Sequence, residues 1–92
     1  MNKISSTKIK KYKAITKKAL AIAKNSVIKG KRIHAQEIFD MVENYMSDAE
    51  HFEKKGDLVD AFAAINYAHG WIDAGVRLDI FDVKDNKLFT IK

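Results

Sequence analysis

Residues 45–61 read YMSDAEHFEKKGDLVDA, and the dipeptide Gly56-Asp57 within this stretch decides the fold. Two lysines followed by glycine are typical of a helix C-terminus, where cations meet the negative end of the helix dipole and glycine takes a left-handed conformation. Asp57 is expected to cap the N-terminus of the next helix. A connection this short predicts that the two helices pack as antiparallel neighbours.

Apolar residues recur at three- and four-residue spacing on both sides of this turn, which predicts helices over residues 32–55 and 57–79. The second of these helices carries two apolar stripes, and two stripes need two neighbours. A third helix, predicted over residues 8–25 and apolar on one face, is expected to cover the second stripe. The first stripe comprises Leu58, Ala61, Ile65, Ala68 and Ile72, and the second comprises Ala64, Tyr67, Trp71, Ala74 and Leu78.

The sequence therefore predicts an all-α protein with a three-helix up-and-down bundle in a single domain spanning residues 1–92. Residues 1–7 are expected to be a flexible N-terminus, 8–79 the bundle, and 80–92 a tail. The tail contains two short β-prone runs, 80–83 and 88–91, which predict either a short β-hairpin or an extended segment packed on the bundle.

The chain has 92 residues and no cysteine, which excludes disulfides and thiolate metal sites. A small domain without disulfides often gains buried area by dimerising. No apolar run approaches the length of about 18 residues that spans a bilayer, and the N-terminus lacks a secretory core. The cytoplasm is therefore the expected location.

The net charge of +5 is unevenly distributed. Residues 1–32 hold ten lysines and one arginine with no acid, whereas residues 33–92 hold six basic and twelve acidic residues. This asymmetry indicates either an anionic partner or a basic helix lying against acidic helices of its own fold. The first reading predicts weak, non-specific nucleic-acid binding through the polar face of helix 8–25, with Lys10, Lys13, Lys17 and Lys24 as the contacts.

Polar residues also follow one face of helix 57–79, at Asn66, His69, Asp73 and Arg77. This polar stripe is either an anion-binding or acid–base strip, in which Asp73 orients His69 or Arg77, or an ordinary Asp–Arg pair on a helix surface. Asp48 of the preceding helix is expected to be partly buried and hydrogen-bonded to Tyr67 or His69.

The sequence contains no catalytic motif of the phosphate-loop, dinucleotide-binding or HExxH type, so the chain is predicted not to be an enzyme. No cofactor is expected. A metal site is not expected either, because the antiparallel register separates His51 from His69 by roughly 10 Å along the axis, too far to share one ion.

An interaction surface is predicted at Tyr67, Gly70, Trp71, Ala74 and Gly75. Aromatic residues often anchor interfaces, and two glycines inside a helix cost about 1 kcal/mol each relative to alanine, which a close contact would offset. The predicted partner is a second copy or another protein. The alternative is that Trp71 is a core residue packed against the first helix.

Two segments, Tyr45–Asp57 and Tyr67–Arg77, resemble an archaeal family of short proteins known only as domain of unknown function 357. The likeness is strongest over residues 45–77, and the helix pattern is compatible from about residue 8 to 83. The resemblance implies a three-helix up-and-down bundle in an archaeal cytosolic protein, and it implies no activity. The lysine-rich character of the first helix and the tail after Val83 fall outside it.

Overall fold

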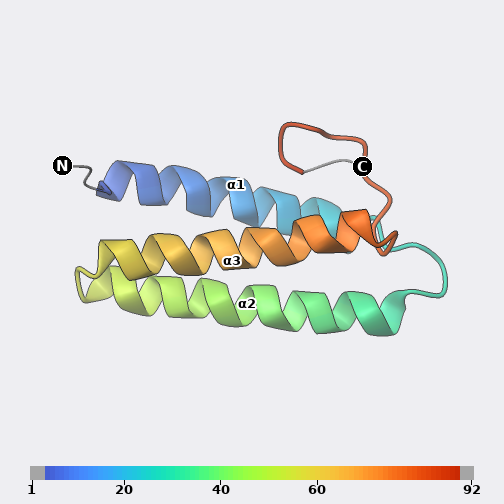
Figure 1. Cartoon of the computed structure of the whole chain (residues 1–92), viewed down its shortest axis with the longest axis horizontal. Helices are drawn as coiled ribbons and strands as arrows, with labels where there is room; N and C mark the ends of the chain where they lie inside the picture. Colours follow the sequence, from blue (N-terminus) through green and yellow to red (C-terminus); the bar gives the residue numbers. More distant parts are fainter. Residues whose placement is uncertain (1–3, 90–92) are drawn as a thin grey trace.

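A computed structural model describes residues 4–89, which form three helices, α1 (Ser6–Lys24), α2 (Arg32–Lys54) and α3 (Leu58–Arg77) (Figure 1). The helices run up, down and up, so the predicted all-α three-helix bundle is confirmed. Every predicted helix end lies within two residues of the observed one. Helix α1 begins at Ser6, inside the segment predicted to be flexible, because the Ser5 side chain accepts a hydrogen bond from the backbone N–H of Lys8 at 3.1 Å.

The turn between α2 and α3 is a helix C-cap followed at once by a new helix. Gly56 has a φ of 81°, as predicted, and its N–H donates to the carbonyl of Glu53 at 3.1 Å. The Asp57 N–H donates to the carbonyl of Phe52 at 2.9 Å, which completes a Schellman motif. The expected side-chain cap is wrong, because Asp57 precedes α3 but its carboxylate makes no capping hydrogen bond.

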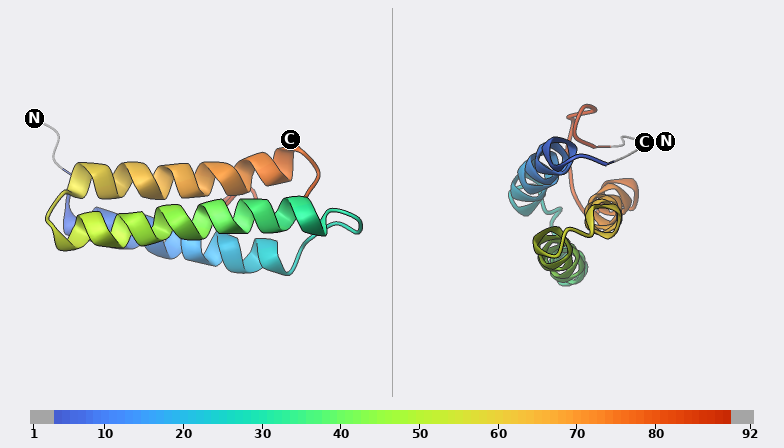
Figure 2. Two further views of the ribbon diagram at one scale, coloured as in Figure 1. Left: turned by 90° about the horizontal axis from the view of Figure 1, so that it is seen from below. Right: turned by 90° about the vertical axis from the view of Figure 1, so that its left-hand side faces the viewer.

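Helix α3 packs along α2, and α1 packs mainly against α3. Seen end-on, α3 forms the apex of a triangle whose base is α1 and α2 (Figure 2). The apolar core consists of two clusters, one around Ile9, Ala49 and Ile65 near the Gly56 turn and one around Val42 and Ile72 toward the opposite end, and the partly buried Met46 packs against both. The apex position leaves one side of α3 facing outward.

Ion pairs connect α1 to α2 across the base of the triangle. Lys13 Nζ lies 3.0 Å from Glu53 Oε1, and Lys24 Nζ lies 2.8 Å from Glu43 Oε1. Part of the basic helix therefore lies against acidic residues of its own fold, which was one of the two readings of the charge asymmetry.

The C-terminal tail contains no strand within residues 80–89 and folds back through a turn at residues 86–88, where the N–H groups of Lys87 and Leu88 donate to Asp85 Oδ1 at 2.8 and 3.2 Å (Figure 1). Its one ladder contact is an isolated antiparallel bridge between Val27 and Phe81, flanked by a hydrogen bond from the Ile28 N–H to the Ile80 carbonyl at 2.9 Å. Within residues 80–89 neither predicted form is present as expected, because no strands form a hairpin and the segment turns at residues 86–88; positions 90–92 lie outside the described residues. The buried rings of Phe81 and Phe89 make the tail part of the core.

The start of the C-terminal tail packs against Gly75 of α3. The chain leaves α3 through Asp79, whose φ is 60°, and the N–H of Ile80 donates to the Gly75 carbonyl at 2.8 Å. The ring of Phe81 then lies directly over Gly75 and stacks on Phe39, with ring centroids 5.4 Å apart. A methyl group on Gly75 would collide with the Phe81 ring and come within 3.0 Å of Ile38 Cδ1. The prediction that Gly75 belongs to an external interaction surface is therefore wrong, because the side chains packed closely against Gly75 are Phe81 and Ile38 of the same chain.

Candidate functional site

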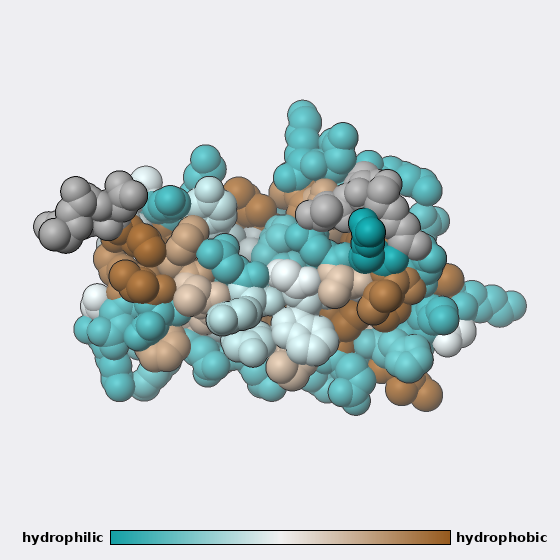
Figure 3. Space-filling model, viewed as in Figure 1, coloured by the Kyte–Doolittle hydropathy of each residue, from teal (hydrophilic) through white to brown (hydrophobic). Residues whose placement is uncertain are grey.

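The outward side of α3 is largely apolar and exposed. Tyr67 and Trp71 are 62% and 38% exposed, and Val59 and Leu78 extend the apolar surface toward the two ends of the helix. The surface, called here the α3 face, consists of Val59, Ala63, Tyr67, Gly70, Trp71, Ala74 and Leu78. On the space-filling view this side shows a brown and pale band between teal surfaces (Figure 3).

The α3 face includes most of the second apolar stripe, so the prediction that α1 covers this stripe is wrong. Ala64 alone of that stripe is buried. Helix α1 instead packs beside it, on the side of α3 that carries His69, where Thr16 and His69 are in contact. Trp71 therefore points outward and is not a core residue against α1.

A shallow groove of about 330 Å³ crosses the middle of the α3 face, lined by Asn66, Tyr67, Gly70, Trp71 and Ala74. A methyl group on Gly70 would meet nothing within 4 Å, so the glycine leaves open space between the two aromatic side chains. The Tyr67 ring is held against Tyr45 of α2, with centroids 5.5 Å apart. The structure thus brings together four of the five predicted surface residues, with Gly75 the exception.

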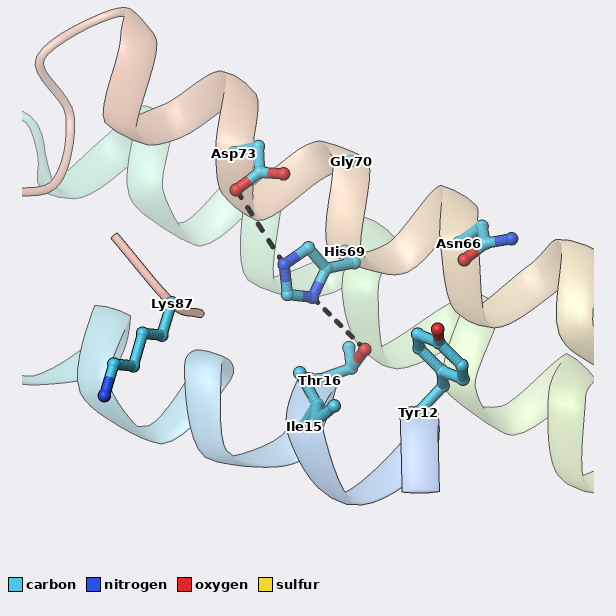
Figure 4. Close-up of a pocket in the computed structure, with 8 residues that line it drawn as sticks. All are labelled: Tyr12, Ile15, Thr16, Asn66, His69, Gly70, Asp73 and Lys87. Carbon is cyan, nitrogen blue, oxygen red and sulfur yellow. Dashed lines mark hydrogen bonds and ion pairs between the residues drawn. The ribbon is translucent and has the colours of Figure 1, made fainter. Parts of the chain in front are cut away.

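A second concavity lies between α1 and α3 (Figure 4). At its centre, Thr16 Oγ1 is 3.3 Å from His69 Nδ1, and His69 Nε2 is 3.8 Å from Asp73 Oδ1. The cleft measures about 370 Å³ and is lined by Tyr12, Ile15, Thr16, Asn66, His69, Gly70, Asp73 and Lys87.

The order hydroxyl, imidazole, carboxylate is the order of groups in a nucleophile relay. Here Thr16 is only 2% exposed, so its hydroxyl is closed to a substrate. The distance of 3.8 Å between His69 and Asp73 is also longer than a hydrogen bond. The arrangement therefore acts as a polar tie between α1 and α3.

The predicted polar stripe is divided by this packing. His69 and Asp73 turn into the cleft, Asn66 borders both concavities, and Arg77 is exposed near the end of α3. The expectation for Asp48 is wrong, because its side chain is exposed and forms no hydrogen bond with any of residues 4–89. It borders a shallow groove that Tyr67 also lines.

The basic helix also divides into two sides. Lys13, whose side chain is 19% exposed, and Lys24 face α2, so two of the four predicted anion contacts form ion pairs within the fold. The outer side, called here the lysine face, consists of Lys10, Lys11, Lys17 and Lys18, which are exposed and form no ion pair with residues 4–89.

Within residues 4–89, no set of three or more histidine or acidic side chains is grouped so that it could hold a metal ion. Over the same part of the chain, every helix is too short or too polar to cross a membrane.

Fold and surface together define a small all-α bundle with one apolar helix face uncovered. The model of the family described as "protein of unknown function (DUF357)" matches residues 11–81, so the chain belongs to this family and the resemblance is confirmed. No curated protein and no solved structure matches. The matched segment contains the whole α3 face and ends at Phe81, the residue that lies over Gly75.

Proposed function

We propose that this chain is a protein-interaction module that docks through the α3 face and has no catalytic activity of its own. The observation that carries the proposal is the uncovered second stripe of α3. Its two large side chains, Tyr67 and Trp71, stand on either side of the open space at Gly70. Contiguous exposed apolar surface on a small protein marks an interaction site more often than a solvated face.

The composition of the α3 face supports the proposal. Tyrosine and tryptophan are enriched among the residues that dominate binding energy, because each places a large rigid surface in contact with a partner. Gly70 and Ala74 keep the backbone accessible between them. Tyr67 is already oriented by its contact with Tyr45, so docking immobilises little side-chain freedom there.

The non-catalytic part of the proposal is supported by the Thr16 tie. The best-placed trio of titratable and hydroxyl groups, Thr16, His69 and Asp73, has its hydroxyl buried and its imidazole–carboxylate distance too long for a relay. A tie of this kind fixes α1 on α3 and leaves the α3 face on the apex of the bundle.

The test is a variant in which Tyr67→Ser and Trp71→Ser are combined, compared with Ile33→Ser. Ile33 is 80% exposed on α2 and lies off the α3 face, so its replacement removes exposed apolar area without touching the proposed surface. Light scattering of the pure protein and quantitative mass spectrometry of proteins co-purified from the native cell are the measurements. The expected result is that an association present in the wild type is lost in the double variant and kept in Ile33→Ser. Identical profiles for all three proteins would overturn the proposal.

A second candidate function is supported by the lysine face. Four exposed lysines without an ion-pair partner among residues 4–89 form a strip on a helix that carries no acidic residue. Lysines in such a strip bind phosphates by releasing counterions, without reading sequence. Non-specific nucleic-acid binding through this face is compatible with docking through α3, since the two surfaces lie on different helices.

A further inference from the structure

We propose that the partner on the α3 face is a second copy of this chain, with the two α3 helices packed antiparallel about a two-fold axis at the level of the Ala68–His69 peptide bond. The inference rests on the proposed function and names its partner. It follows from the order of residues along the α3 face.

The α3 face is self-complementary in the antiparallel direction. In such a pair, each residue stands level with the residue of the second copy that is equally far from the midpoint, and two-fold symmetry repeats every contact. Asp60 then stands level with Arg77 of the second copy, so opposite charges coincide at both ends of the interface. Ala63 stands level with Ala74 of the second copy, so two small residues face each other on either side of the axis.

The centre of the face follows the same rule. Tyr67 stands level with Gly70 of the second copy, at the groove of about 330 Å³ that Gly70 leaves open. A ring on one helix entering a gap on the other is the packing that joins helices side by side. The symmetry provides this contact twice, once for each copy.

The parallel arrangement sets like against like. Asp60 would stand level with a second Asp60 and Arg77 with a second Arg77, which is repulsive at both ends. Two Tyr67 rings and two Trp71 rings would also compete for the same levels, while the space at Gly70 stayed empty. In the antiparallel pair, the positive N-terminal end of each helix dipole also lies beside the negative C-terminal end of the other, which favours this arrangement over the parallel one.

The size of the face sets the strength of the association. Helix α3 has 20 residues, and such a helix is about 30 Å long and about 10 Å wide, which gives a contact of about 300 Å² on each copy. Stable complexes bury about 1,200 Å² or more in total. The proposed dimer is therefore expected to be weak and reversible, and to form only at high protein concentration.

The experiment uses two single-cysteine variants, Ala63→Cys and Ala74→Cys, because the chain has no cysteine of its own. In the antiparallel pair, positions 63 of the two copies lie about 16 Å apart along the axis, beyond the Cα separation of about 7 Å that a disulfide tolerates. Position 63 of one copy faces position 74 of the other. Mild oxidation of the two variants mixed together is therefore expected to give a covalent dimer, and neither variant alone to do so. Ile33→Cys, mixed with either variant, measures random collision.

Each outcome decides the inference. Cross-linking in the mixture alone, at least tenfold above the Ile33→Cys control, supports the antiparallel dimer. Cross-linking of each variant with itself overturns the register. If no cross-link forms and light scattering finds a monomer at millimolar concentration, self-association is overturned. In that case the proposed function stands only if a co-purified protein is lost with the Tyr67 and Trp71 replacements.

Discussion

Alanine substitution at the two glycines inside α3 is expected to change stability in opposite directions, although both lie in the same helix. At either position alanine removes the entropic penalty of a helical glycine, a gain of about 0.5–1 kcal/mol. At Gly70 nothing opposes this gain, because a methyl group would meet no atom within 4 Å. Gly70→Ala is therefore expected to stabilise the protein by about 0.5–1 kcal/mol.

At Gly75 the same methyl group overlaps the ring of Phe81, which is 2% exposed and stacked on Phe39, so the ring has no free space into which it can move. Overpacking of this kind costs about 1–3 kcal/mol. Since it exceeds the gain in helix propensity, Gly75→Ala is expected to destabilise the protein by about 1–2 kcal/mol. For a domain of this size 1 kcal/mol shifts Tm by about 4–8 °C, so the two variants should differ by roughly 6–24 °C.

The assay is thermal and urea unfolding followed by circular dichroism, at low micromolar concentration so that association through α3 does not contribute. A third protein, Gly75→Ala combined with Phe81→Leu, removes the colliding ring atoms and is expected to show a coupling of about 0.5–3 kcal/mol between the two positions. If Gly75→Ala proves as stable as Gly70→Ala, the reasoning that the Phe81 ring packs on Gly75 and leaves no room for a methyl group is refuted.

Two further predictions concern helix α1, one on its contact with α3 and one on its lysine face. Thr16→Val keeps the shape of the side chain but removes the hydroxyl that contacts His69, so the free energy of unfolding in urea is expected to fall by about 0.5–1.5 kcal/mol. The matched control Thr16→Ser keeps the hydroxyl and should be closer in stability to the wild type. Equal stability of Thr16→Val and the wild type would contradict the role of this contact. Replacement of all four lysines of the lysine face by glutamine is expected to abolish the weak binding of a labelled single-stranded oligonucleotide at low salt, measured by fluorescence anisotropy. Replacement of Lys13 and Lys24 by glutamine is the control and should preserve this binding, because both lysines form ion pairs with α2. A wild-type protein that does not bind even at low salt would leave the lysine face as a solvated surface.

The helices and their order could be predicted from the sequence because the signals for them are local. Lys54-Lys55-Gly56 is enough to end one helix, and the positive φ of Gly56 and its two flanking hydrogen bonds show the expected C-cap. Apolar periodicity then fixes which residues share a face of each helix.

The candidate site could be predicted only in part, since periodicity says that residues share a face but not which neighbour covers it. Both stripes of α3 are made of apolar and aromatic residues. The choice of which stripe α1 leaves open depends on long-range contacts such as Thr16 with His69, 53 positions apart. The same limit applies to charge. Lys13 and Lys24 look like Lys10 and Lys17 on a helical projection, yet their glutamate partners lie 40 and 19 positions away.

Gly75 shows why a residue can be recognised as exceptional and still be assigned to the wrong contact. The reasoning that a helical glycine needs a close neighbour is correct for Gly75, but the neighbour is Phe81, only six positions along the chain. The chain turns back onto α3 because Asp79 takes a left-handed conformation. Such a conformation is predicted from sequence mainly at glycine, and no glycine stands at this position. For Gly70 no such neighbour is found among residues 4–89, so of these two glycines Gly70 is the one assigned to the α3 face.

The two surfaces are expected to respond differently to salt, and this separates the proposals on one sample. Each copy carries a net charge of +5, so two copies repel overall, and salt screens both this repulsion and the attraction between Asp60 and Arg77 of the second copy. The apolar contacts at the centre of the α3 face do not depend on charge, so association through this face is expected to persist as salt rises. Binding of a polyanion to the lysine face depends on counterion release and weakens steeply as salt rises. An association that persists as salt rises and is lost when Tyr67 and Trp71 are replaced belongs to α3. One that fades as salt rises and is lost when Lys10, Lys11, Lys17 and Lys18 are replaced belongs to α1.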